Sequence, residues 1–141
     1  MLQEGLVSRF AADPGITALI GTPQSRPDGS NGVFPVTMPQ GAPLPCIVYM
    51  KVAGHEIDSM DGRGELRVSR VQIAGYGTQY GDAAKTAEAA KDAIVGFKGL
   101  LDDGTQIDAV FLVLESDAFE SVPKIYQEPF DVEIWYRNAN S

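Results

Sequence analysis

The chain has 141 residues, of which 44% are hydrophobic and 21% are charged, so it is long and apolar enough to form one folded domain over residues 1–141. Its 19 acidic and 11 basic side chains give a net charge of -8, the opposite of the balance that tight binding to a phosphate backbone requires. The longest uncharged apolar run, residues 109–114, is far shorter than the roughly 20 residues that span a bilayer, and the N-terminus lacks the basic and apolar regions of a signal peptide. These features predict a soluble, intracellular, acidic domain.

Two helices are predicted at the N-terminus. Apolar residues recur at helical spacing over residues 2–12 and predict an amphipathic helix. Asp13 ends that helix and can cap a second, short one. Pro14 suits the first position of this second helix because no backbone N–H is needed there.

The segment 21–45 is predicted to be mostly irregular. It holds six of the nine prolines, and proline cannot donate a hydrogen bond to a helix or a central strand. Only residues 33–36 could form a short edge strand. A connection of this length is often a binding loop. Because it cannot bury much apolar surface alone, we expect it to be mobile in the isolated protein.

A long β-hairpin is predicted over residues 47–76. Its first strand, residues 46–53, is apolar on both faces, which predicts a central position in a sheet. The apolar alternation of its second strand, residues 65–76, changes phase near Ser69-Arg70, which predicts a bulge or a sharp twist there. The tip, residues 54–64, should project past the body of the domain and should also be mobile.

The strongest predicted helix covers residues 81–98, where alanines form a stripe at helical spacing and Gly99 is a plausible C-cap. Residues 106–114 and 126–137 are predicted strands. Helices and strands in this order predict an α+β fold, with a mainly antiparallel sheet, helices packed on one face and the long projecting β-hairpin.

One segment resembles a nucleotide-binding turn. Residues 75–81, Gly-Tyr-Gly-Thr-Gln-Tyr-Gly, follow a strand and open a helix, as the glycine-rich turn of a dinucleotide site does. The last spacing is one residue too long, however, and the preceding strand is too polar for a strand buried on both faces. We therefore favour a plain strand-to-helix turn. A small nucleotide-binding enzyme using Gly75 to Gly81 is the alternative from a different functional class.

Metal and nucleophile chemistry receive little support from the sequence. Four residues at the hairpin tip could offer nitrogen and oxygen ligands, but their spacing does not follow a calcium loop. Cys46 lies in a predicted strand, where a small buried hydrophobic residue is the default, and the single histidine is in a distant loop. We predict no enzyme activity, no catalytic residues, no metal site and no cofactor.

The acidic charge is concentrated near the C-terminus. Residues 101–141 carry nine acidic and two basic side chains, whereas residues 1–100 carry ten and nine. A solvated strand face is the simpler interpretation, and a surface that repels phosphate or complements a basic partner is the sharper one. Three arginines along one hairpin arm (Arg63, Arg67 and Arg70) are either solvated or contact such an acidic surface on the next copy in a head-to-tail ring.

Taken together, the segments resemble the tail completion or tail terminator proteins of long-tailed bacteriophages over nearly the full length of the chain. Residues 12–21 are similar to the N-terminal segment of that family, and residues 41–49 look like its proline-then-strand signature. Residues 70–77 with the following alanine-rich helix resemble its central strand and helix. Residues 130–136 look like its closing strand.

The resemblance implies a virion structural protein at the head-proximal end of the tail, assembled in the host cytoplasm. Such proteins form a ring, typically a homohexamer, on the last ring of tail tube protein. They end tube growth and present a surface to the head–tail connector protein. Another connector or a tube-like protein is the nearest alternative. We expect no membrane partner and no specific nucleic-acid binding, although DNA would pass through the ring.

Two sets of residues are expected to serve this ring. The first would contact a neighbouring subunit or partner and consists of His55, Glu56, Asp58, Asp61, Arg63, Arg67 and Arg70. The second would line an acidic channel or its rim, where negative charge keeps DNA from sticking, and consists of Asp108, Glu115 and Asp117.

Overall fold

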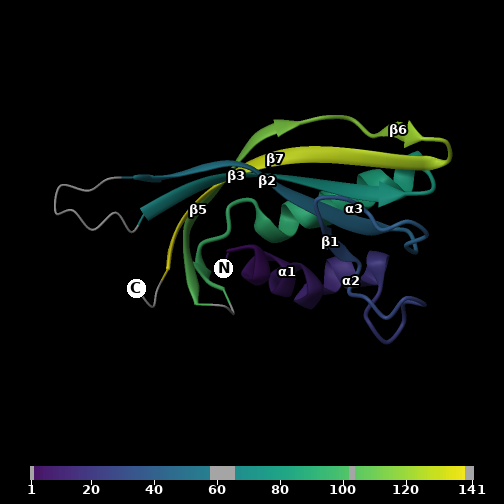
Figure 1. Ribbon diagram of the computed structural model, residues 1–141, viewed down its shortest axis with the longest axis horizontal. Coiled ribbons are helices and arrows are strands. Elements are labelled where there is room, and N and C mark those ends of the chain that lie inside the picture. The colour runs from purple at the N-terminus through teal and green to yellow at the C-terminus, as the bar shows by residue number, and fades with distance from the viewer. Residues whose placement is uncertain (1, 58–65, 102–103, 139–141) are drawn as a thin grey trace.

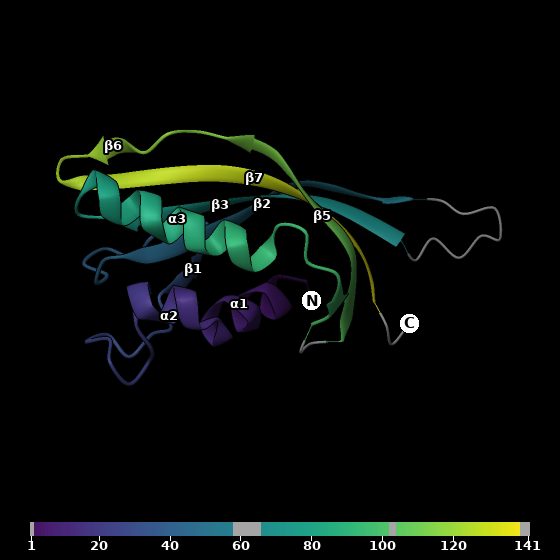
Figure 2. The same ribbon diagram turned by 180° about the vertical axis from the view of Figure 1, so that it is seen from behind.

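A computed structural model describes residues 2–57, 66–101 and 104–138 of the chain. The described residues form a curled sheet with helices on one face, which Figures 1 and 2 show from opposite sides. The helices are α1 (Leu2–Ala12), α2 (Pro14–Ile20) and α3 (Tyr80–Ile94). The strands are β1 (Val33–Pro35), β2 (Cys46–Ile57), β3 (Leu66–Gly77), β4 (Gly99–Leu100), β5 (Thr105–Glu115), β6 (Phe119–Val122) and β7 (Ile125–Asn138).

The strand order across the sheet is β1-β2-β3-β7-β5-β4, and β6 also pairs with β7. Every neighbouring pair is antiparallel except β1 and β2, which are parallel. Because β3 occupies one edge of β7, β5 and β6 follow one another along the other edge. This arrangement confirms the α+β fold predicted from the sequence.

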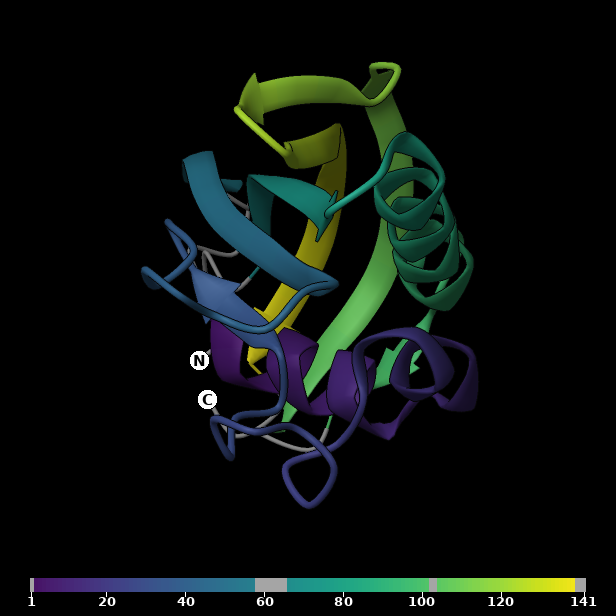
Figure 3. The same cartoon turned by 90° about the vertical axis from the view of Figure 1, so that its right-hand side faces the viewer.

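The helical face of the sheet holds the core. In Figure 3, α1 and α2 lie below the curled strands and α3 lies to one side of them. Alternate residues of the central strands, such as Ile73 and Val132, point into this core and are almost fully buried. They pack against Leu6 and Phe10 of α1 and the alanine stripe of α3.

The two N-terminal helices form as predicted. The Asp13 carboxylate accepts hydrogen bonds from the backbone N–H groups of Gly15 at 2.8 Å and Ile16 at 3.2 Å, which caps α2 with Pro14 at its first turn. Residues 33–35 form the predicted short edge strand.

The long connection after α2 follows a path around one buried side chain. Arg26 is 7% exposed, and its guanidinium donates to the carbonyls of Ile20 at 2.7 Å, Pro43 at 2.6 Å and Pro45 at 3.0 Å. The Oδ1 atom of Asp28 lies 3.4 Å from the Nε of Arg26 and supplies the opposite charge. A hydrogen bond from the Ser30 backbone to the Asp28 carboxylate is the main cause that lowers the pKa of Asp28. The expected mobility of this segment stays a prediction that amide exchange would test.

The hairpin departs from its predicted geometry at two places. The extra residue of the bulge is Val52 of β2, opposite Arg70 and Val71, and not a residue of the second strand as predicted. β3 itself pairs with β7 without a shift, so its phase change reflects burial of Val68 on the face opposite that of Val71. β2 is central only over residues 47–49, where β1 covers it.

The long helix is shorter than predicted. α3 ends at Ile94 and Val95 is its C-cap, so Gly99 is not the cap but the first residue of β4. The chain leaves the helix because Gly96, with φ of 81°, turns back to donate its N–H to the Val110 carbonyl at 3.1 Å. The strands β4 and β6 were not predicted from the sequence.

Candidate assembly surfaces

The glycine-rich turn at residues 75–81 has a packing role. A Cβ atom at Gly75 would lie 2.6 Å from the backbone nitrogen of Ala87, and one at Gly77 would lie 2.6 Å from the Cβ of Asp82. Side chains at these positions would therefore push α3 off the sheet. This close approach explains both glycines without a phosphate ligand and favours the interpretation as a strand-to-helix turn.

The three acidic residues assigned to a channel or rim lie along β5 and the turn after it, and each has a partner within the chain. Asp108 accepts from Arg137 at 3.0 and 2.8 Å. Glu115 accepts from Lys91 of α3 at 2.8 Å. Asp117 accepts from the hydroxyl of Tyr80, and this hydrogen bond is the main cause that raises the pKa of Tyr80. These three carboxylates are thus tied to other elements, and their place in a channel stays a prediction.

Lys91 is the centre of the largest charge cluster among the described residues. Its Nζ lies 2.8 Å from Glu115, 3.7 Å from Glu128 and 3.9 Å from Glu88. Burial alone would lower the pKa of Lys91, but these carboxylates, Glu115 foremost, outweigh it and raise that pKa.

The pKa of Glu128, in the same cluster, is also shifted. Burial, together with the neighbouring carboxylates, raises the pKa of Glu128, although Lys91 acts in the opposite direction. Only the pair of Glu88 and Lys91, three residues apart on one helix, could have been recognised from the sequence.

The predicted hairpin interface is only partly visible. His55 and Glu56 belong to β2, opposite Val68 and Arg67, and not to the tip as predicted. Arg70 forms an ion pair with Asp131 of β7 at 2.8 Å, so its charge is already compensated within the chain. Three further members of this set, Asp58, Asp61 and Arg63, lie outside the described residues. The role of this set in an interface stays a prediction.

An exposed apolar surface that was not predicted from the sequence lies at the end of β5 and on β6. Where β5 leaves the core, Phe111 is 55%, Leu112 39%, Val113 45% and Leu114 54% exposed. Phe119 and Val122 of β6 continue this surface. We call residues 111–115 with 119–122 the β5–β6 edge. Monomeric proteins rarely leave such a contiguous apolar stretch in contact with water. The apolar run of residues 109–114 was visible in the sequence, but only the fold shows that residues 111–114 are uncovered.

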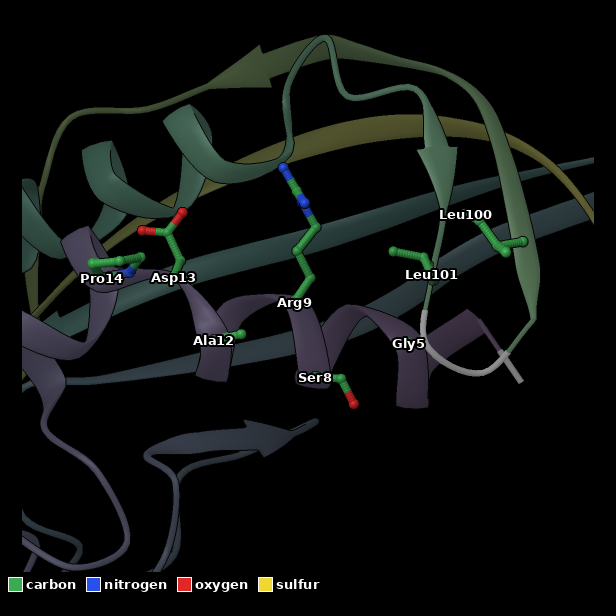
Figure 4. Close-up of a pocket in the computed structure, with 8 residues that line it drawn as sticks. All are labelled: Gly5, Ser8, Arg9, Ala12, Asp13, Pro14, Leu100 and Leu101. Atoms are coloured by element: carbon green, nitrogen blue, oxygen red, sulfur yellow. The ribbon is translucent and has the colours of Figure 1, made fainter.

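A pocket of about 270 Å³ lies between α1 and the segment at β4 and is drawn in Figure 4. Two charged side chains line it, and Asp13 is engaged in capping α2. The other is Arg9, whose Nε donates to the Ala93 carbonyl at 2.7 Å and whose guanidinium stacks 3.7 Å above the ring of Phe97. Figure 4 shows that this side chain points away from Ser8 toward the end of α3. Arg9 therefore joins α1 to α3, and the pocket lacks the convergent polar groups of a ligand site.

Metal ligands, membrane-spanning helices and the cysteine are three further features of the described part of the chain. No group of three or more histidine, cysteine, aspartate or glutamate side chains there is placed to hold a metal ion. None of the helices is long and apolar enough to cross a membrane, again over the described residues. Cys46 is buried, and burial raises the pKa of its thiol to about 12, so it is a poor nucleophile.

Comparisons with known proteins place the chain in a family. No protein among the curated ones matches its sequence. Its fold is similar to that of a chain in the virion of a native gene transfer agent particle, with a TM-score of 0.66, 20% sequence identity, and coverage of 96% of this chain and 94% of the other. The family described as tail completion protein gp17 matches residues 4–137. The chain therefore belongs to the gp17 family of tail completion proteins, which are structural components of phage tails.

Proposed function

We propose that the protein caps the tail tube as a homohexameric ring, ends tube polymerisation and presents the surface to which the head connector joins. The observation that carries the proposal is the match of residues 4–137 to a tail completion family. A virion component with this family membership acts through surfaces and not through a reaction, and the family argues against enzyme activity. Its site of action would be the head-proximal end of the tail, after assembly in the host cytoplasm.

The geometry of the chain supports an assembly role. The β5–β6 edge leaves apolar side chains uncovered, which suits a protein that completes its fold against neighbours.

The acidic C-terminal third suits a ring that DNA traverses, and we propose that Asp108, Glu115 and Asp117 lie at its channel or rim. Replacing all three by asparagine or glutamine should make DNA adhere to the ring and should lower the yield of infectious particles. Normal assembly and DNA passage in that variant would remove the channel proposal alone.

Electron microscopy of particles made without this gene tests the main proposal. Overlong tails, or tails that never join heads, are the expected result. Tails of normal length on infectious particles would overturn it. The nearest alternative, a tube-like protein, is separated by self-assembly, because a tube protein polymerises into long tubes in solution and a terminator does not.

A further inference from the structure

The β5–β6 edge is a sheet edge with no partner strand among the described residues. β5 pairs with β7 on one side, and β4 covers its other side only at Gln106 and Ile107. Beyond the bond from the Gly96 N–H to the Val110 carbonyl, no backbone hydrogen bond between described residues reaches that side of residues 111–115. An apolar strand with free backbone groups is a template for pairing, and proteins normally cover or charge such edges.

A second free edge lies on the opposite side of the same sheet. β1 ends at Pro35, and its cover of β2 stops at the bond from Val36 N–H to the Tyr49 carbonyl, 2.7 Å long. From there on, the outer side of β2 has no partner strand within the described ranges. Residues 50–54, which we call the β2 edge, are all exposed, and Val52 is 51% exposed.

The two edges lie at the same level of the sheet, and their strands run in opposite directions. Leu112 of β5 pairs with Val132, Val132 pairs with Val71, and Val71 pairs with Lys51, so the two edges lie on one line across the sheet. Three antiparallel steps separate β2 from β5, so they run in opposite directions. A second copy in the same orientation would therefore place its β2 antiparallel to β5, which is the pairing that sheets form most readily.

Charge also favours this pairing over two identical edges. The β5–β6 edge carries the acidic residues Glu115 and Glu120, and Asp117 lies between its two strands. The β2 edge carries the exposed Lys51 and no acid. Two β5–β6 edges together would bring carboxylates against carboxylates, whereas the β2 edge offers apolar side chains and a positive charge.

We infer that the β2 edge of one copy pairs with the β5–β6 edge of the next, so that the sheets of successive copies join head to tail. The occupant of each edge is a second copy of this chain, because the chain carries both halves of the contact on opposite sides. Such a contact is heterologous, and it closes into a ring when the rotation between copies allows it. This inference rests on the proposed ring and identifies its subunit contact.

Cysteine pairing tests this contact directly. Val52→Cys on the β2 edge and Val113→Cys on the β5–β6 edge are made as single variants and as a double variant, with Met50→Cys and Leu112→Cys as a second pair for a neighbouring register. The native Cys46 is fully buried and does not compete. The mixed single variants should form disulfide-linked dimers that neither forms alone, and the double variant should form a covalent ladder. Equal cross-linking of Val113→Cys with itself, or assemblies of normal size without cross-links in either register, would overturn the inference.

Charge insertion gives an independent readout. Val113→Lys and Val52→Glu should each weaken association by about tenfold or more, because the first brings a lysine against Lys51 and the second brings a carboxylate against the acidic residues of the β5–β6 edge. Leu100→Lys is the control, since Leu100 is also exposed, at 62%, but lies outside both edges. Sedimentation measures the association, and circular dichroism verifies that all three variants fold. Unchanged association in both edge variants would overturn the inference.

The outcome is separable from that of the proposed function. Overlong tails after gene deletion, combined with absent cross-links, would retain the tail role and overturn the edge pairing. Cross-links between the two edges, combined with normal tails after deletion, would retain the edge pairing and overturn the tail role.

Discussion

The two halves of β5 have opposite surroundings, and the more apolar half is the exposed one. In the first half, Ile107 is fully buried and Val110 is 3% exposed, both under the helices. In the second half, four consecutive apolar residues face solvent. Hydrophobicity along a strand therefore does not tell whether a residue belongs to the core of the subunit or to a contact between subunits. The two halves should respond differently to mutation.

The largest expected effect comes from truncating each half in turn. Ile107→Ala should lower the free energy of unfolding by about 2–5 kcal/mol, because it leaves a cavity in the core. Leu112→Ala should lower it by less than about 1 kcal/mol in the isolated subunit, because little buried contact is lost. Urea unfolding measures both values. Similar losses in the two variants would show that the second half is also part of the subunit core.

A second test extends the comparison to a segment that is polar and yet well anchored. Arg26→Met should cost about 1–3 kcal/mol, because it leaves buried carbonyls of Ile20 and Pro43 without a donor. Hydrogen exchange should then show faster amide exchange across residues 21–45 than in the wild-type protein. Equal exchange in the two proteins would mean that Arg26 does not hold this segment.

A third test uses two glycines at the junction of β3 and α3. Gly75→Ala should destabilise the fold by about 1–3 kcal/mol, because the new methyl group would meet the backbone of α3. Gly81→Ala is the matched control inside the helix, where nothing lies within 4 Å, and it should be neutral or stabilising by up to about 1 kcal/mol. Thermal unfolding compares them. A stable Gly75→Ala variant would contradict the packing role of that glycine.

The smallest expected effect is a pH dependence of the folding stability, caused by Glu128 of β7. Because the pKa of Glu128 is raised in the folded state, its ionisation disfavours folding, and this cost appears as the pH rises from below the unfolded pKa through the folded one. Glu128→Gln should match the wild-type stability near pH 4 and exceed it by less than about 1 kcal/mol at pH 7. Melting curves at both pH values test this. A variant less stable than wild type at pH 7 would show that attraction to Lys91 outweighs the burial.

Periodicity in the sequence was sufficient for most of the fold. The capping of α2 by Asp13, the alanine stripe of α3 and the alternation in β7 depend on neighbours in the chain, so they could be predicted. The bonds of Arg26 to carbonyls 17 and 19 residues away could not, because they depend on the folded path of the loop. The predicted end of α3 was wrong for the same reason, since the N–H of Gly96 bonds to the carbonyl of the distant Val110.

The functional surfaces were less accessible from the sequence. The whole-chain resemblance led to the tail completion family, which the family match over residues 4–137 confirms. The residues of the assembly contact could not be found in the same way. Exposure of residues 111–114 depends on the folded arrangement of sheet and helices, and no local pattern carries that information.

The length of β7 has a mechanical consequence. It pairs with β3 without interruption from Tyr136 opposite Arg67 to Tyr126 opposite Gly77. The hydrogen bonds of an antiparallel pair lie across the strands, so a pull along the hairpin loads the whole ladder in shear instead of opening it bond by bond. The hairpin and β7 together therefore form a stiff unit that resists tension along the long axis of the subunit. The edges beside this unit remain free to bind.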